Sequence, residues 1–219
     1  MMTLNLFDHA EQSRVWKETI CPGAVVLRHF ALTYETVIFA ALTDVVGQAP
    51  FRHMVTPGGF QMSAAMTSCG GFGWLADRTG YRYNTTDPQT GLPWPPLPDA
   101  LLRLGIEAAT AAGYPSFVPD ACLINRYAVG AKMSLHQDKD EPDLGAPIVS
   151  VSLGLPANFQ FGGLRREDKP LRVQLTHGDV VVWGGPARLY FHGVLPIKDG
   201  VHPLTGAFRI NLTFRKVSK

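Results

Sequence analysis

The sequence predicts an α+β fold in which two helices precede a double-sheet β jelly roll or sandwich. Two segments in the first half have helical periodicity, and from residue 120 onward short strand-like segments follow one another without a helix between them. The chain has 219 residues, of which 46% are hydrophobic and 17% charged. We therefore expect one domain, 1–219, with a substantial core.

The first helix is expected over 33–48 with Thr33 as its N-cap, and the second over about 99–112, ended by Gly113. Both have an apolar face at helical spacing. The residues of these faces are Val37, Ile38, Ala41, Leu42, Val45 and Val46 in the first helix, and Leu101, Leu102, Ala108 and Ala109 in the second. Both helices are expected to support the β core.

Between the helices, residues 50–98 are rich in Gly, Pro, Thr and aromatic side chains and predict hairpins and loops. Such a stretch is often a variable surface insertion. Aromatic side chains are costly to expose without a purpose, however, and long ordered loops in compact domains are often lids. The aromatic residues in question are Phe72, Trp74, Tyr81, Tyr83 and Trp94.

The β core is expected over about 120–215, where short segments rich in β-branched and aromatic residues are separated by Gly, Pro and Asp. These segments are ACLINRY, PIVSVSLGL, NFQFGG, LRVQLT, DVVVWGG, RLYFHGV and FRINLTFR.

Bulk properties exclude several classes of protein. The formal net charge of +2 is too small to indicate a nucleic-acid partner by itself. The three cysteines, Cys21, Cys69 and Cys122, are far apart and form no CxxC pair, which fits a reducing cytoplasm and argues against a zinc ribbon or disulfide scaffold. No membrane span and no secretory signal are expected.

The stretch SLHQDKDEPD contains a candidate metal-binding pair. On a strand, residues two apart point to the same face, so His136 and Asp138 would converge. A charged run of this kind is more often a solvated loop, and HxD alone is a weak signal. A third ligand is more plausible at His192, after an apolar strand, than at His177 in a turn or His202 before a proline. Two His and one carboxylate hold Fe(II) and leave three positions open.

The last predicted strand alternates polar and apolar residues, so that Arg209, Asn211 and Arg215 share one face. An ordinary amphipathic edge strand has the same pattern. Beside a metal site, however, two arginines suit a dicarboxylate, because a guanidinium binds a carboxylate through two hydrogen bonds. Asn125 and Tyr127 also share a face and offer an amide and a phenol to the same ligand.

The segments NRY, HQD, SLGLPANFQFGG, HGDVVVWGG, RLYFHGV and RINLTFR resemble the AlkB family of bacterial Fe(II)- and 2-oxoglutarate-dependent dioxygenases, which repair alkylated nucleobases. The resemblance extends from about residue 51 to 215. It implies a double-stranded β-helix (jelly-roll) core with supporting N-terminal helices and a β-hairpin/loop nucleotide-recognition lid over about 50–98. It also implies that His136, Asp138 and His192 are the iron ligands.

By this resemblance, the co-substrate 2-oxoglutarate would be held by Arg209 and Arg215, with Arg209 on its distal carboxylate. Asn125, Tyr127 and Asn211 would donate hydrogen bonds to it. With Fe(II) and O2, the enzyme would hydroxylate the N-methyl group of a damaged base and release formaldehyde, succinate and CO2.

The implied substrates are 1-methyladenine and 3-methylcytosine in single- or double-stranded DNA, with RNA as a further substrate. Trp74 and His136 would stack on the base, and Asp140 would lie near its positive charge. Tyr81 and Tyr83 would contact the nucleotide backbone. The resemblance implies one further substrate contact, from Arg166.

The alternatives are an Fe(II)/2-oxoglutarate hydroxylase acting on protein or a small molecule, and a non-catalytic metal-binding β-sandwich. The aromatic lid favours the nucleic-acid enzyme, which we expect to be monomeric and cytoplasmic. Within HQDKDE, the residues that do not face the site, Gln137, Lys139 and Glu141, are expected to be solvated.

Overall fold

The computed structural model describes residues 15–218; residues 1–14, where no secretory signal is expected, lie outside the described residues. Two helices, two short 3-10 segments and three antiparallel sheets make up the described part. The helical segments are η1 Phe30–Tyr34, α2 Glu35–Gln48, α3 Asp99–Ala112 and η2 Gly185–Ala187. The strands are β1 Trp16–Cys21, β2 Ala24–Arg28, β3 Arg52–Val55, β4 Gln61–Gly70, β5 Gly73–Asp77, β6 Gly80–Asn84, β7 Ala121–Ala128, β8 Met133–His136, β9 Ile148–Gly154, β10 Ala157–Phe161, β11 Leu171–Leu175, β12 Val180–Trp183, β13 His192–Val194 and β14 Phe208–Arg215.

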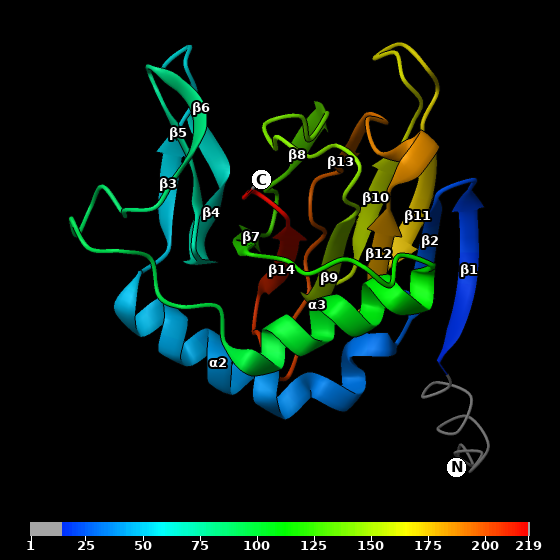
Figure 1. Ribbon diagram of the computed structural model, residues 1–219, viewed down its shortest axis with the longest axis horizontal. Helices are drawn as coiled ribbons and strands as arrows, with labels where there is room; N and C mark the ends of the chain where they lie inside the picture. Colours follow the sequence, from blue (N-terminus) through cyan, green and yellow to red (C-terminus); the bar gives the residue numbers. More distant parts are fainter. Residues whose placement is uncertain (1–14, 219) are drawn as a thin grey trace.

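The two larger sheets form the predicted jelly-roll core (Figure 1). One has eight strands in the order β1-β2-β12-β9-β14-β7-β4-β3, and the other has four in the order β11-β10-β13-β8. Side chains from both sheets share one core, in which Phe159 and Phe161 of β10 pack around Trp183 of β12. The third sheet is the β5–β6 hairpin.

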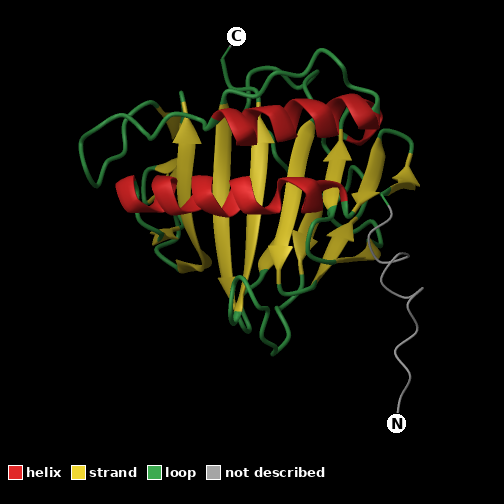
Figure 2. Cartoon of the chain, turned by 90° about the horizontal axis from the view of Figure 1, so that it is seen from below, coloured by secondary structure: helices red, strands yellow, loops and turns green. Residues whose placement is uncertain are grey.

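Helices α2 and α3 lie side by side across the outer face of the eight-stranded sheet (Figure 2). As predicted, Gly113 ends α3, in a left-handed conformation with φ 102°. Thr33, however, is not the N-cap of α2. It lies inside η1, where its hydroxyl donates to the Phe30 carbonyl, and the helix begins only at Glu35. The expected apolar face is also narrower than predicted, because Val37 is 46% exposed.

One described helical segment, Phe30–Gln48, is long and apolar enough to cross a membrane by length and composition alone. In the fold, Ile38, Leu42 and Val45 of this segment are buried in the cluster beneath the large sheet. Packing on the sheet therefore accounts for the apolar residues of this buried face.

The prediction that RLYFHGV forms one strand is wrong for most of these residues. The 3-10 turn η2 precedes Arg188, and strand pairing resumes only at His192, which begins β13 instead of ending a strand. Gly185 at φ 52° and Pro186 explain the turn, because neither favours a continuing strand. Strands β1, β2 and β8 were not predicted.

The stretch 50–98 contains hairpins, as expected, but it is not a separate insertion. Strand β4 pairs with β7 and so belongs to the eight-stranded sheet. Trp94 is buried, and its indole N–H donates to the Asn84 carbonyl at 3.0 Å. Gly73 is required beside it, since a Cβ there would lie 2.1 Å from the Trp94 ring. Trp94 therefore holds the β5–β6 hairpin in place.

Asp120 fixes the end of β14, the strand that carries the predicted arginines. Its carboxylate accepts the Val217 and Ser218 backbone N–H groups at 2.7 and 2.9 Å and lies 3.1 Å from the Lys216 ammonium. Burial raises the pKa of Asp120, but the hydrogen bonds outweigh burial and lower it below the ordinary value.

A carboxyl group whose pKa is lowered on folding stabilises the protein above its unfolded-state pKa of about 3.9, and this contribution is lost as pH falls through the lower folded value. We expect Asp120→Asn to cost about 1–3 kcal/mol of unfolding free energy at pH 7. The difference from wild type should shrink at pH 3. Urea unfolding at both pH values tests this, and an equal difference at both would contradict the ionic role.

Candidate metal centre and cofactor pocket

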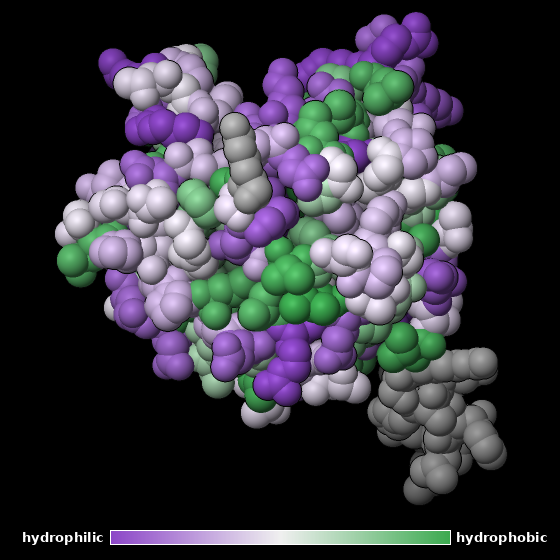
Figure 3. Space-filling model, in the orientation of Figure 1, coloured by the Kyte–Doolittle hydropathy of each residue, from purple (hydrophilic) through white to green (hydrophobic). Residues whose placement is uncertain are grey.

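A cavity of about 650 Å³ opens between the two larger sheets and the β5–β6 hairpin. Figure 3 shows a notch between two arms at the top of the view, and Figure 1 identifies these arms as the β3–β6 region and the β10–β11 connection. Hydrophilic residues gather on both arms. All predicted site residues except Tyr83 line the cavity, namely Trp74, Tyr81, Asn125, Tyr127, His136, Asp138, Asp140, Arg166, His192, Arg209, Asn211 and Arg215.

Three of these residues form a metal-binding group. The ligand atoms of His136, Asp138 and His192 lie within 4.8 Å of one another. His136 ends β8 and is paired in register with His192 of β13, whereas Asp138 lies two residues beyond the strand. Only His136 therefore lies on a strand, so His136 and Asp138 do not share a strand face as the HxD pattern predicted. The backbone turns after His136 and still brings the carboxylate between the two imidazoles.

Hydrogen bonds orient both imidazoles toward the carboxylate. His136 Nδ1–H donates to the Ser134 carbonyl at 2.9 Å, and His192 Nδ1–H donates to the Tyr190 carbonyl at 3.0 Å. Each ring therefore points its Nε2 toward Asp138, at 3.6 and 3.7 Å from the nearer carboxylate oxygen. Fixing the second nitrogen in this way is the usual means of orienting a metal-binding histidine.

Burial and charge prepare these groups to bind a cation. Burial and the neighbouring His136 lower the pKa of His192 to about 4, so it is neutral at pH 7 and its nitrogen lone pair is free. Burial raises the pKa of Asp138, but the Arg215 guanidinium and the two imidazoles outweigh burial and lower it, so the carboxylate is ionised. Two imidazoles and one carboxylate are the donor set that suits Fe(II).

Arg209 is a buried cation without a carboxylate partner among the described residues. It is 1% exposed, and its Nη2 donates to the Ser152 hydroxyl at 2.9 Å. Its Nε and Nη1 have no hydrogen-bond partner among residues 15–218. Burial lowers the pKa of Arg209. An uncompensated buried guanidinium is costly, which indicates a site for an anion.

Arg215, in contrast, is already paired. Its Nη2 donates to Asp138 Oδ2 at 2.8 Å, and its Nε lies 3.1 Å from Glu141 Oε1. Glu141 also contacts Arg188, at 2.9 Å. The prediction that Glu141 is solvated is therefore wrong: it is 5% exposed. Gln137 is also not fully solvated, because its amide donates to the Leu189 carbonyl at 2.6 Å.

Polar side chains near Arg209 complete the pocket. Asn125 Oδ1 is buried without a partner among the described residues, and the Tyr127 ring lies 5.1 Å from the Arg209 guanidinium. The Asn211 side-chain amide donates within the protein, to the Ser150 hydroxyl and to the Val151 carbonyl, each at 2.8 Å.

Sequence reasoning missed Ser150 and Ser152, which hold Asn211 and Arg209 respectively. Their signal is present, since two serines spaced by two in an otherwise apolar strand share a polar face. Glu141 and Arg188 have no comparable signal, because they meet only through the fold.

The β5–β6 hairpin places an aromatic surface at the cavity. The Trp74 indole N–H donates to Asp140 at 3.0 Å, and the ring stacks on exposed Tyr81 at 5.5 Å. Arg166 donates to the Leu135 carbonyl at 2.5 Å and so lies beside β8. Tyr83 is not among the residues that line the cavity, but its hydroxyl donates to Glu141, which is one of them.

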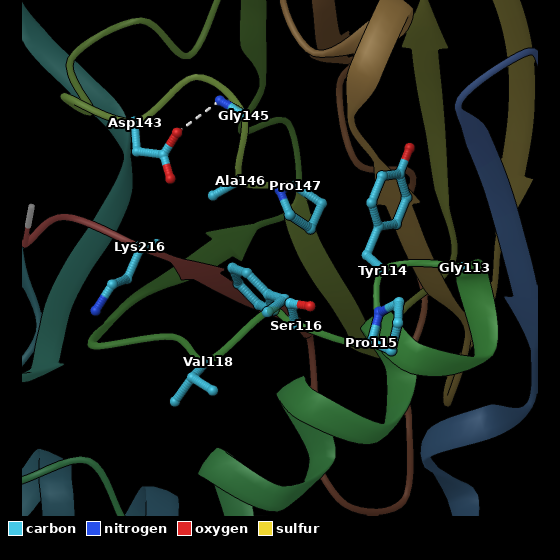
Figure 4. A pocket seen from close by; sticks show the side chains of 11 residues that line it. Gly113, Tyr114, Pro115, Ser116, Val118, Asp143, Gly145, Ala146, Pro147 and Lys216 are labelled. Atoms are coloured by element: carbon cyan, nitrogen blue, oxygen red, sulfur yellow. Dashed lines mark hydrogen bonds between the residues drawn. The ribbon is translucent and has the colours of Figure 1, made fainter.

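A second cavity, of about 430 Å³, lies at the end of α3 (Figure 4). Tyr114 and Lys216 contribute to its wall, together with Asp143, which accepts a hydrogen bond from the Gly145 N–H at 2.8 Å. None of the described residues that line it is a predicted site residue. It therefore offers no alternative to the cavity that contains the His–Asp–His group.

Comparison with known proteins decides the family. A model described as the 2OG-Fe(II) oxygenase superfamily matches residues 23–215. The chain belongs to this superfamily. The oxygenase is 60% identical over 216 residues to "Alpha-ketoglutarate-dependent dioxygenase AlkB" of Escherichia coli (strain K12), with 99% of each chain covered. It is 49% identical over 200 residues to the AlkB homolog of Caulobacter vibrioides (strain NA1000 / CB15N), covering 90% of this chain and 89% of that one.

A solved structure, "The structure of OsALKBH1", matches this oxygenase with a TM-score of 0.79 and 32% identity. The match covers 92% of this chain and 100% of the other. The oxygenase uses Fe(II), 2-oxoglutarate and O2. The residues present fit these groups, because the cavity offers a cation site at the His–Asp–His group and a buried cation, Arg209, that needs an anion.

Proposed function

We propose that the oxygenase repairs alkylated nucleobases by oxidative demethylation, acting on 1-methyladenine and 3-methylcytosine in single- or double-stranded DNA and in RNA. One observation in the structure carries the proposal. An aromatic ring and a carboxylate, Trp74 and Asp140, are hydrogen-bonded to each other in the same cavity as the metal-binding group. A flipped base needs an aromatic surface to stack on, and a cationic base favours a nearby carboxylate.

The chain's own side chains hold and orient the reactants. His136, Asp138 and His192 would hold the iron. Arg209 would bind the distal carboxylate of 2-oxoglutarate, with Asn125 and Tyr127 beside it.

Asn211 would act by holding the surrounding strands, because its donors are already used. Arg215 would contribute through Asp138, to which it is paired. When bound, Fe(II) and 2-oxoglutarate supply the oxidising chemistry that inserts one oxygen atom of O2 into a C–H bond.

The substrate chemistry then needs little further help from the protein. A hydroxymethyl group on a ring nitrogen is unstable and leaves as formaldehyde, which restores the base. Trp74 and His136 would hold the base between them, and Asp140 would face its positive charge. Tyr81 and Arg166 line the same cavity and would contact the nucleotide. We further propose that the enzyme works as a monomer in the cytoplasm, without a membrane partner.

The test is to supply the protein with Fe(II), 2-oxoglutarate and O2 and to measure formaldehyde and succinate with an oligonucleotide that contains 1-methyladenine. We expect formaldehyde only with the methylated oligonucleotide, and at least as much succinate as formaldehyde, because substrate-independent decarboxylation adds succinate alone. Formaldehyde no higher than in a no-enzyme control would exclude this function. Turnover of a peptide or small molecule instead would establish the alternative hydroxylase.

Trp74→Ala should weaken oligonucleotide binding and leave substrate-independent decarboxylation of 2-oxoglutarate unchanged. Stacking on an aromatic ring contributes about 1–3 kcal/mol per base, so KM should rise by about 5- to 150-fold. Trp74→Phe is the matched variant, since it keeps a ring but loses the N–H that orients Asp140. Equal loss of both activities in Trp74→Ala would contradict a role limited to the substrate.

A further inference from the structure

Four charged side chains lie buried in contact with one another beside the metal centre. Asp138, Glu141, Arg188 and Arg215 are each at most 8% exposed. Both arginines contact both acidic residues. Arg215 contacts the two carboxylates, and Arg188 contacts the Glu141 carboxylate and, from Nη1, the Asp138 backbone carbonyl at 2.5 Å. Two anions thus balance two cations, which is the condition under which buried charges are tolerated.

Glu141, like Arg188, has no part in the proposed reaction. Glu141 is not one of the three metal-binding residues, and both of its carboxylate oxygens already contact arginine side chains. Its main effect is on Arg215. With Glu141 present, the Arg215 guanidinium is shared between two carboxylates, so Asp138 keeps more negative charge for the metal. Without it, Arg215 would be balanced by Asp138 alone.

The β5–β6 hairpin reaches the same group. The Tyr83 hydroxyl donates to Glu141 Oε1 at 2.5 Å, the oxygen that also faces Arg215. Trp74, the cross-strand neighbour of Tyr83, donates to Asp140. The hairpin is therefore attached to consecutive acidic residues by two paired side chains. Of this pair only Trp74 lines the cavity, whereas the Tyr83 hydroxyl contacts the cavity residue Glu141.

We propose that Glu141 is a positioning residue for the iron ligand Asp138, acting through Arg215, and that Tyr83 holds Glu141 in place from the lid. This assignment replaces the nucleotide-backbone contact expected for Tyr83. It rests on the metal centre of the oxygenase and not on the identity of the substrate. Removing an outer partner of a metal ligand typically lowers metal affinity by about 10- to 100-fold.

The experiment measures Mn(II) binding, as a redox-stable probe, to the metal-free protein by titration calorimetry without nucleic acid. Glu141→Gln, which keeps the shape but removes the charge, should raise the Kd for Mn(II) by about 10- to 100-fold. Tyr83→Phe should raise it by less. The matched control is Tyr34→Phe, which removes another tyrosine–glutamate hydrogen bond, to Glu107 of α3 and away from the cavity, and should leave the Kd unchanged.

A second readout separates positioning from a purely structural role. The visible absorption of bound Co(II) reports the geometry of its ligands, and it should change in Glu141→Gln and Tyr83→Phe. In the double variant, the two effects on Kd should be less than additive, because both residues act through the same contact.

A Kd for Mn(II) within twofold of wild type in folded Glu141→Gln would overturn the proposal. If that variant does not fold, Tyr83→Phe decides, because it keeps all four buried charges; an unchanged Kd and Co(II) spectrum would then overturn it. Since the assay contains no nucleic acid, its result is independent of the demethylation assay. Either proposal can fail while the other stands.

Discussion

Replacing Arg209 by methionine should weaken 2-oxoglutarate binding by more than about 100-fold, because deleting one partner of a buried charge pair costs about 3–5 kcal/mol. The same change should leave the cofactor-free protein at least as stable as wild type. Arg209 is buried without a carboxylate partner among the described residues, so its removal takes away an uncompensated charge. Loss of affinity together with retained stability is the signature expected of a residue reserved for a ligand.

Thermal unfolding with and without 2-oxoglutarate and Mn(II) tests both parts. A ligand at 100 times its Kd adds about 2.7 kcal/mol to wild-type stability, and this gain should be absent in Arg209→Met at the same concentration. Arg126→Met is a suitable control. Arg126 lies on β7 between two cavity residues but faces away, over the Phe51 and Phe208 rings. An unchanged gain in Arg209→Met, with a loss in Arg215→Met, would assign the carboxylate to Arg215 instead.

Asp138→Ala should abolish turnover and lower Mn(II) affinity by more than about 100-fold. Removing a residue that only supports a metal ligand already lowers metal affinity by up to about 100-fold. Asp138 is itself a ligand and the single anion of the metal group. Its loss also leaves Arg215 with Glu141 as its remaining carboxylate. Titration calorimetry with Mn(II) and the formaldehyde assay measure the two effects.

The matched control for this change is Asp140→Asn. Asp140 is an exposed carboxylate two residues away that lines the same cavity but is not in the metal group. It should keep wild-type metal affinity. A comparable loss of Mn(II) affinity in both variants would show that nearby negative charge attracts the metal and that Asp138 does not coordinate it.

The β core and both helices could be predicted because their signals are local. Alternation in β14 puts Arg209, Asn211 and Arg215 in the cavity and Leu212 and Phe214 among the helices, as the sequence pattern requires. The prediction that RLYFHGV is one strand fails where backbone geometry overrides side-chain type. Tyr190 and Phe191 are good strand formers, but the turn at η2 leaves only the last residues free to pair.

The metal group was predictable and its surroundings were not. His136 and Asp138 are close in sequence, and the resemblance to known dioxygenases pointed to His192. Glu141 looked like a solvated acid because nothing near it in the sequence suggests a partner. Its burial depends on Arg188 and Arg215, which lie 47 residues or more away and meet it only in the folded chain. The Tyr83–Glu141 contact could not be predicted from the sequence for the same reason.

The two ligands of this enzyme should meet parts of the fold that open at different rates. Strand β14 is flanked by β9 and β7 inside the eight-stranded sheet, whereas β5 and β6 pair only with each other. Amide hydrogens of β14 should therefore exchange with solvent only in global unfolding, and those of β6 through frequent local opening. The surface for 2-oxoglutarate is then assembled once, when the chain folds. The surface for the base would separate and re-form repeatedly in the native protein. Substitutions in the hairpin could therefore alter substrate choice without altering the oxidative chemistry.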